Sequence, residues 1–214
     1  MTTPIRHRYR AQVRDEVKAA ALRQLAEGGP QALSINAIAK ELGVSGPALY
    51  RYFAGRDELL TELVVDSYDD LGRAVGDAAD RARGRAARDR LRALARAYRK
   101  WALAQPHRYS LLFAAPVPGY DAQAERIVEA SEHAMNVLVG VLGDAGTEVP
   151  SAALARELER WARSRNIDAS APVALRAVQV WARLHGFVSL EIGGNFASMG
   201  LDADQLFRAE LERL

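Results

Sequence analysis

The chain has 214 residues and a net charge of +2, with 49% apolar and 26% charged residues, a composition that excludes a disordered protein. It contains no cysteine, which excludes disulfides, cysteine nucleophiles and cysteine-bound zinc. No apolar run approaches the ~20 residues of a membrane-spanning helix and no signal-peptide pattern is present, so we expect a cytoplasmic protein without a membrane partner.

Positive charge is concentrated at the front of the chain. Residues 1–60 carry a net charge of +3, whereas residues 61–214 carry −1. The cations that precede or open the first predicted helix are Arg6, Arg8, Arg10, Arg14 and Lys18. They suit a polyanionic partner such as DNA, although a solvated helix terminus explains them at least as well.

The sequence predicts an all-α fold, because it holds 40 alanines and no alternating strand pattern. Before residue 55, apolar periodicity predicts helices over about 8–27, 35–42 and 45–53. The first ends at Gly28-Gly29-Pro30, and the other two are joined by Gly43-Val44-Ser45.

Amphipathic patterns continue to the C-terminus and predict a longer helical body. The segments 105–106 and 115–120 contain proline and are expected to connect helices. The expected helices cover about 56–83, 91–101, 124–142, 151–163, 172–193 and 202–214.

The second and third helices fit a helix-turn-helix motif. Gly43 suits the tight turn, and Ala39 is small where crossed helices pass closest. The apolar positions that would bury the corner are Ile38, Leu42, Val44, Leu49 and Tyr52. An ordinary helical hairpin is the alternative interpretation of this pattern.

The stretch from Leu33 to Leu60 resembles the DNA-binding head of the TetR (tetracycline repressor) family of bacterial transcription regulators. The motifs that carry the resemblance are Leu42-Gly43-Val44-Ser45, Ala48-Leu49-Tyr50, Tyr52-Phe53 and Arg56-Asp57-Glu58-Leu59-Leu60. Aromatic residues at the end of the recognition helix, followed by a basic residue and a leucine pair, distinguish this family from a generic helix-turn-helix.

The resemblance implies a ligand-responsive repressor that binds a palindromic DNA operator as a homodimer and is released by a small molecule. It places the DNA-binding domain at residues 1–55, with the helix-turn-helix at about 34–53. The body at residues 56–214 would bind the ligand and form the dimer.

The resemblance also assigns DNA-binding roles to individual residues. Ser34 and Ser45 stand at helix starts near phosphates, and Arg56 would bind a phosphate. Arg51 is the candidate for reading a guanine edge. The remaining candidates are Gly46, Pro47, Ala48, Tyr50 and Tyr52, the last of which also occupies a core position of the motif.

In the C-terminal body, Trp181, His185 and Gly186 resemble the tryptophan-histidine-glycine pattern of one TetR subgroup. The helix that carries them is apolar nearly all round, so we expect it to pack on its own core and on a second subunit. The homodimer would form through residues 172–193 and 202–214.

The resemblance places the effector cavity in the body, and the effector is expected to be largely apolar. Any one of the aromatic candidates is better explained by core packing, and His185 by a core histidine bonded to a carbonyl. The candidate ligand-binding residues are Tyr98, Trp101, Tyr109, Phe113, Trp181 and His185.

Other functions find little support in the sequence. The arginine-rich stretch 81–100 alternates with alanine and favours a solvated face over a DNA contact. No catalytic motif, metal-ligand spacing or cofactor fingerprint is present, so we expect no catalytic residue, metal or cofactor. An enzyme and a structural helical oligomer remain the alternatives, and the oligomer leaves the basic front unexplained.

Overall fold

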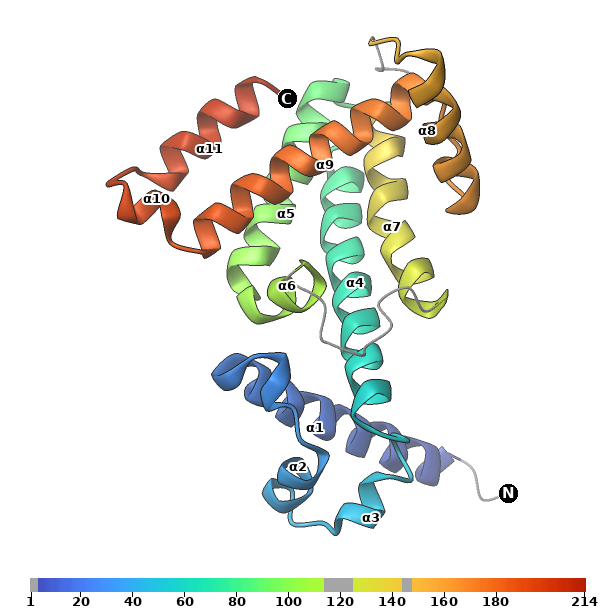
Figure 1. Cartoon of the computed structure of the whole chain (residues 1–214), viewed down its shortest axis with the longest axis vertical. Helices are drawn as coiled ribbons and strands as arrows, with labels where there is room; N and C mark the ends of the chain where they lie inside the picture. The colour runs from blue at the N-terminus through green and yellow to red at the C-terminus, as the bar shows by residue number, and fades with distance from the viewer. Residues whose placement is uncertain (1–3, 114–124, 144–147) are drawn as a thin grey trace. The chain divides into compact units, whose positions relative to one another are not determined.

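The computed structural model describes residues 4–113, 125–143 and 148–214, with side chains from residue 8 onward except at Pro30. Every regular element in these ranges is a helix, as the sequence predicts (Figure 1). None of these helices is long and apolar enough to cross a bilayer. In chain order they are α1 (Pro4–Gly28), the 3-10 helix η1 (Pro30–Ala32), α2 (Ile35–Glu41), α3 (Gly46–Leu49), α4 (Arg56–Arg81), α5 (Ala87–Ala104), α6 (Pro106–Phe113), α7 (Glu125–Leu142), α8 (Ala152–Ser164), α9 (Ala171–Ile192), α10 (Asn195–Ser198) and α11 (Ala203–Glu212).

The helices form two compact units. The first is drawn from Met1–Ser67 and His107–Ile127, and the second from Tyr68–Pro106 and Val128–Leu214. The long helices α4 and α7 therefore begin in the first unit and continue into the second.

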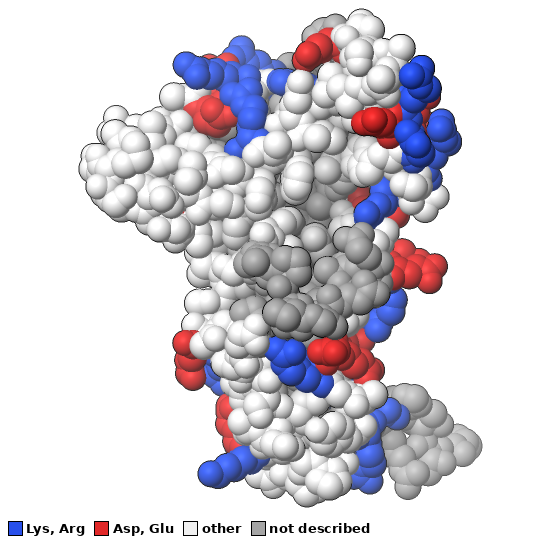
Figure 2. Space-filling view, in the orientation of Figure 1, with Lys and Arg blue, Asp and Glu red and all other residues white. Residues whose placement is uncertain are grey.

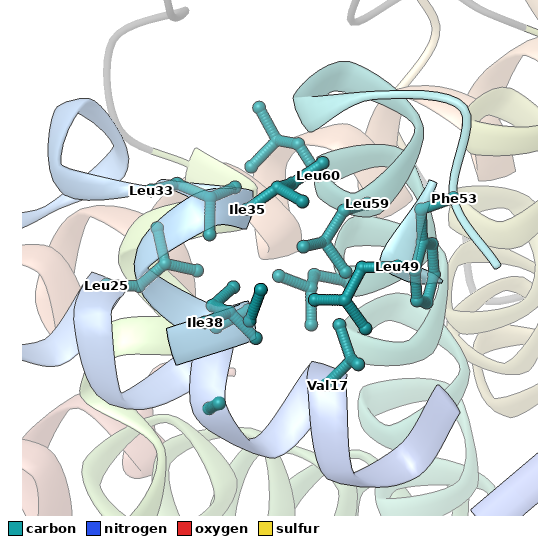
Figure 3. Close-up of a cluster of buried hydrophobic side chains, with 13 residues drawn as sticks. Val17, Leu25, Leu33, Ile35, Ile38, Leu49, Phe53, Leu59 and Leu60 are labelled. Carbon is teal, nitrogen blue, oxygen red and sulfur yellow. The ribbon is translucent and has the colours of Figure 1, made fainter. Parts of the chain in front are cut away.

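A buried apolar cluster holds the first four α-helices of the first unit together (Figure 3). Val17 of α1, Ile38 of α2, Leu49 of α3 and Leu59 of α4 meet there, with Phe53 from the link between α3 and α4. Each of these side chains is at most 1% exposed. Burial of one such side chain contributes roughly 1.5–3 kcal/mol, so this cluster fixes the short helices α2 and α3 on the longer ones.

The sequence prediction missed helix α6. The N–H of Gln105 bonds the Trp101 carbonyl at 2.9 Å and ends α5, and Pro106 then occupies the first position of α6. Proline is well tolerated at a first helical position, because no helical partner exists there for an N–H. A residue that suggests a break in the sequence therefore starts a helix, which carries the buried Tyr109.

Most other predicted helices agree with the structure to within a few residues. The exceptions are α1 and α5, which both begin four residues earlier than predicted, and α3, which is shorter. The brief elements η1 and α10 were not predicted. The connection predicted over 115–120 lies outside the described residues.

Arginine side chains fasten α11 to α5 and α9 in the second unit. The last four carbonyls of a helix lack partners within it, and arginines supply donors to those at the end of α11. Arg92 Nε donates to the Leu211 carbonyl in α11 at 3.1 Å, and Arg176 Nη2 donates to the carbonyl of Leu214, which follows the helix, at 2.7 Å. The Glu212 carbonyl accepts a hydrogen bond from Arg88.

The interpretation of the stretch 81–100 as a solvated face therefore does not hold throughout. Besides Arg88 and Arg92, Arg99 is only 14% exposed and pairs with Glu191 at 2.5 Å and Asp204 at 2.7 Å. Several arginines of this stretch thus serve to hold the C-terminal helix in place.

Helices α4 and α7 pack closely at Gly72, within the second unit. A Cβ at this position would lie 2.3 Å from Cδ2 of His133 on α7, which is closer than real atoms approach. Alanine at Gly72 would force His133 to move, although alanine is the better helix former.

We expect Gly72→Ala to be less stable than the alanine variant of an uncrowded helical glycine by about 0.5–1.5 kcal/mol, because the exposed His133 side chain must turn away from the new Cβ. Gly140→Ala in α7 is the matched control, because no atom lies within 4 Å of a Cβ there. That control is expected to gain up to about 1 kcal/mol from helix propensity. Denaturant titration measures both, and His133→Ala is expected to rescue Gly72→Ala. A Gly72→Ala variant as stable as Gly140→Ala would contradict the close packing.

Candidate nucleic-acid interface

The turn between α2 and α3 is built on Gly43. Its φ of +68° lies in the left-handed region, which favours glycine because it lacks a Cβ. The N–H of Gly43 bonds the Lys40 carbonyl at 3.3 Å, and the N–H of Val44 bonds the Ala39 carbonyl at 2.9 Å. This pair of bonds is a Schellman motif, which ends α2 sharply and starts the chain toward α3.

The recognition segment is shorter than the sequence predicts. Residues Gly46–Leu49 are α-helical, and hydrogen-bonded turns continue through Tyr52. Leu49 points into the core, whereas Tyr50 and Arg51 are exposed. Neither exposed side chain has a hydrogen bond or an ion pair within the described part of the chain. The outward face of the segment is therefore available for a partner.

The motif's predicted apolar contacts are confirmed with one exception. Ile38 and Leu49 are buried, while Leu42 and Tyr52 pack partly against the same cluster. Val44 is 42% exposed, because it follows Gly43 in the turn and points away from the core. The prediction that Val44 is buried in the corner is wrong.

The two predicted capping serines differ in their contacts. Ser34 Oγ accepts a hydrogen bond from the Ala37 N–H at 3.3 Å and caps α2. Ser45 precedes α3 but makes no side-chain capping bond. Gly46 begins α3, and a Cβ there would lie 3.0 Å from Asn36 Oδ1. The Ser34 hydroxyl thus has a structural role as a helix cap, whereas the Ser45 hydroxyl caps no helix.

The other predicted DNA contacts lie around the same segment. Pro47 is exposed and Ala48 is half-buried on the first turn of α3. Arg56 occupies the first position of α4, half-buried, with its guanidinium 3.6 Å from the Asp57 carboxylate. The structure thus brings these residues together in one part of the first unit.

Two arginines of α1 bind the end of the recognition segment, a role that the sequence did not reveal. Arg10 Nη2 donates to the Arg51 carbonyl at 3.2 Å, and Arg14 Nη1 donates to the Tyr52 carbonyl at 2.5 Å. Lys18 pairs with Asp66 at 2.7 Å. These cations, predicted to suit DNA or solvent, instead make contacts within the protein. The only signal in the sequence was their spacing of one helical turn.

Comparisons with known proteins agree with this geometry. Residues 18–63 match the family described as "Bacterial regulatory proteins, tetR family", and residues 91–214 match "Tetracyclin repressor-like, C-terminal domain". The chain is 32% identical to the HTH-type transcriptional regulator Rv1816 of Mycobacterium tuberculosis, over 96% of this chain and 92% of that protein. The chain belongs to the TetR family. It is a helix-turn-helix transcription regulator, and membership decides against the enzyme alternative.

Solved structures extend the similarity to the whole TetR-family fold. The regulatory protein SCO4313 has 45% identity and a TM-score of 0.83, covering 99% of this chain and 98% of its own. A protein of unknown function from Rhodococcus sp. RHA1 has 27% identity and a TM-score of 0.71, covering 94% and 92%. FadR from Bacillus subtilis, at 17% identity and a TM-score of 0.62 over 92% and 95%, shares the fold. The tryptophan-histidine-glycine subgroup stays a prediction.

The candidate ligand-binding aromatics of this TetR-family chain fall in both units. In the first unit, the rings of Tyr109 and Phe113 lie 5.0 Å apart on α6. In the second, Tyr98 and Trp101 are buried on α5, and Trp101 Nε1 donates to Asp70 Oδ2 of α4 at 3.0 Å. The Trp101 bond ties α5 to α4, so its indole has a packing role.

Trp181 and His185 form a stacked pair on α9, with ring centroids 5.5 Å apart. Trp181 is 37% exposed, whereas His185 is half-buried. Burial lowers the pKa of His185, so this imidazole is neutral at pH 7. The pair presents an aromatic surface together with one neutral polar ring.

A groove of about 520 Å³ lies between α5 and α11. Its walls include Phe207 and the basic residues Arg96, Arg99, Lys100 and Arg208. None of the predicted ligand-binding residues lines it.

The serine contacts lead to a paired prediction. We expect Ser34→Ala to lower the free energy of unfolding by about 1 kcal/mol through loss of a helix cap. Ser45→Ala is expected to leave it unchanged, because that hydroxyl makes no capping bond. Chemical denaturation of both variants measures the difference. Equal stability of the two variants would show that the Ser34 cap contributes nothing.

Proposed function

We propose that this regulator is a ligand-responsive repressor that binds a palindromic operator as a homodimer and leaves it when a small molecule binds. The observation that carries the DNA-binding part is the outward face of the recognition segment. There Tyr50 and Arg51 are exposed and have no hydrogen bond or ion pair to any described residue. A fold that buries Leu49 and Phe53 so completely while leaving an arginine unpaired beside them is suited to a polyanionic partner.

The proposed DNA contacts follow from the hydrogen-bond donors that each residue offers. Arg51 would donate two hydrogen bonds to O6 and N7 of a guanine, and Tyr50 would donate to a phosphate. Ser45, Arg56 and the amides at the start of α3 would bind phosphates and set the register. The remaining proposed contacts are Ser34, Gly46, Pro47, Ala48 and Tyr52.

We assign DNA binding to residues 1–55 and ligand binding and dimerisation to residues 56–214, in the cytoplasm. The proposed dimer interface is formed by residues 172–193 and 202–214. Residues 192–201, between these helices, carry no charged side chain, and Figure 2 shows uncharged surface over α10. Met199 and Leu201 in this segment and Leu190 on the last turn of α9 are exposed, which favours cover by a second copy.

The effector is proposed to be largely apolar. The neighbour FadR was solved in complex with stearoyl-CoA, a molecule with a long apolar chain. The aromatic residues Tyr98, Trp101, Tyr109, Phe113 and Trp181 and the neutral His185 are the proposed contacts. Suppose that the effector binds more tightly to a dimer in which the distance between the two DNA-binding domains does not match the operator. It would then shift the population toward that dimer and release the DNA.

Footprinting on the DNA that flanks the regulator's own gene tests the proposal. In a dimer, two recognition segments would enter successive major grooves about 34 Å apart. We expect a protected palindrome whose affinity falls steeply with salt, and no protection on unrelated DNA. If neither this DNA nor a random-sequence selection yields a preferred site, the proposal fails.

Arg51→Ala is expected to flatten base preference at one position of each half-site, by a factor of roughly 5 to 150 for a loss of about 1–3 kcal/mol. Its affinity for unrelated DNA is expected to change far less. Binding to an operator library measures both quantities. Arg163→Ala in α8 is the control, because this exposed residue pairs only loosely with Glu159, at 3.9 Å. An unaltered base preference would remove Arg51 from readout.

Arg56→Ala is expected to weaken binding to all sequences alike. The loss of one phosphate contact lowers the slope of log affinity against log salt concentration by about 0.9. Titrations at several salt concentrations measure this slope for the variant, the wild type and Arg163→Ala. A slope equal to that of the wild type would reject the phosphate contact.

A further inference from the structure

The recognition segment depends on donors from another helix. Only four of its residues are α-helical, and its last carbonyls, on Arg51 and Tyr52, accept hydrogen bonds from Arg10 and Arg14 of α1. The Arg14 guanidinium also lies 4.4 Å from the ring centre of Phe53. The position of α1 relative to the segment is therefore fixed by Arg14 through two contacts at once.

The guanidinium of Arg14 also forms an ion pair with Glu62 of α4. Arg14 Nη2 lies 3.0 Å from Glu62 Oε2, while its Nη1 is the donor to the Tyr52 carbonyl. The two side chains are 25% and 15% exposed, so this pair is better shielded than an ordinary surface ion pair. The planar guanidinium of Arg14 thus links the Glu62 carboxylate on α4 to the Tyr52 carbonyl at the end of the recognition segment.

Glu62 has another partner at the start of α7. Arg126 Nη2 lies 2.8 Å from Glu62 Oε1, the oxygen that Arg14 does not use. Burial alone would raise the pKa of Glu62, but hydrogen bonds from Arg126 and Arg14 outweigh it and lower the pKa. The carboxylate is therefore ionised at neutral pH and binds both arginines. Lys18 lies farther away, 3.9 Å from Oε2.

We propose that Arg14 is a positioning residue for DNA recognition, and that the contacts Arg126–Glu62–Arg14–Tyr52 carbonyl link the first turn of α7 to the recognition segment. All four groups lie in the first unit, and α7 continues from there into the second. A displacement of the first turn of α7 would change how Glu62 divides its charge between two arginines. Arg14 would then move against the carbonyl that it holds.

This inference rests on the proposed operator binding. For Glu62→Gln, an effect of charge alone and a loss of positioning predict opposite changes in operator affinity. Glu62→Gln removes a negative charge, so a simple electrostatic effect would strengthen binding to any DNA. Loss of positioning instead weakens operator binding, because the recognition segment is no longer held in one orientation. The direction of the change therefore distinguishes the two explanations.

The experiment compares Glu62→Gln, Arg14→Lys and Arg126→Gln with the wild type and with the control Arg163→Gln. Operator affinity is expected to fall about tenfold for Glu62→Gln and Arg14→Lys, in line with the loss of a charged hydrogen bond. Arg126→Gln is expected to have a smaller effect, since its side chain is 58% exposed. Affinity for unrelated DNA and the salt slope of Arg126→Gln should match the wild type. Because the contacts form one chain, the double variant Arg126→Gln/Arg14→Lys should lose less operator-binding free energy than the two single variants lose in sum.

Hydrogen exchange on the DNA-free protein tests the same link without an operator. Amides of residues 50–53 are expected to exchange faster in Glu62→Gln and Arg126→Gln than in the wild type and in Arg163→Gln. Unchanged exchange, or operator binding by Glu62→Gln at least as tight as that of the wild type, would overturn the inference. If the wild type prefers no DNA sequence while exchange responds as expected, the proposed operator binding fails and the structural link stands.

Discussion

The structure depends on tertiary support for a recognition helix that is too short to form alone. An isolated helix of four residues is unstable in water, because nucleation fixes several dihedral angles for a single hydrogen bond. In this chain its inner side is held by burial of Leu49 and Phe53, and its start by the turn at Gly43. Its end is held by arginine donors from α1. The orientation of the outward residues is therefore a property of the whole first unit.

The C-terminal helix shows the same principle. The end of α11 is held by Arg92 from α5 and by Arg176 and Arg183 from α9, each of which donates to a main-chain carbonyl. A guanidinium suits this role because its planar donors can bind a carbonyl and a carboxylate together, as Arg92 does with Leu211 and Glu212. The preference for 26 arginines over 3 lysines thus has a structural use in both units.

Local patterns in the sequence were sufficient to predict the helical fold and most of the DNA-binding motif. The turn at Gly43 and the cap at Ser34 depend on neighbouring residues, so they could be inferred from spacing alone. The contacts of Arg14 could not, because its partners lie 38 residues or more along the chain and no local pattern encodes them. Helix α6 was missed for a different reason, since Pro106 is equally compatible with a break and with a first helical position.

A division of roles within the recognition segment follows from these contacts. Leu49 and the Tyr52 carbonyl are engaged in the interior, so replacing or displacing them disturbs folding. The side chains of Tyr50 and Arg51 make no hydrogen bond or ion pair to the described residues, so their identity has little effect on stability. If the outer residues read bases as proposed, base preference can change there while the inner contacts stay constant. The proposed regulation, in contrast, would act through the inner contacts, because in the described part of the chain these connect the segment to α1, α4 and the start of α7.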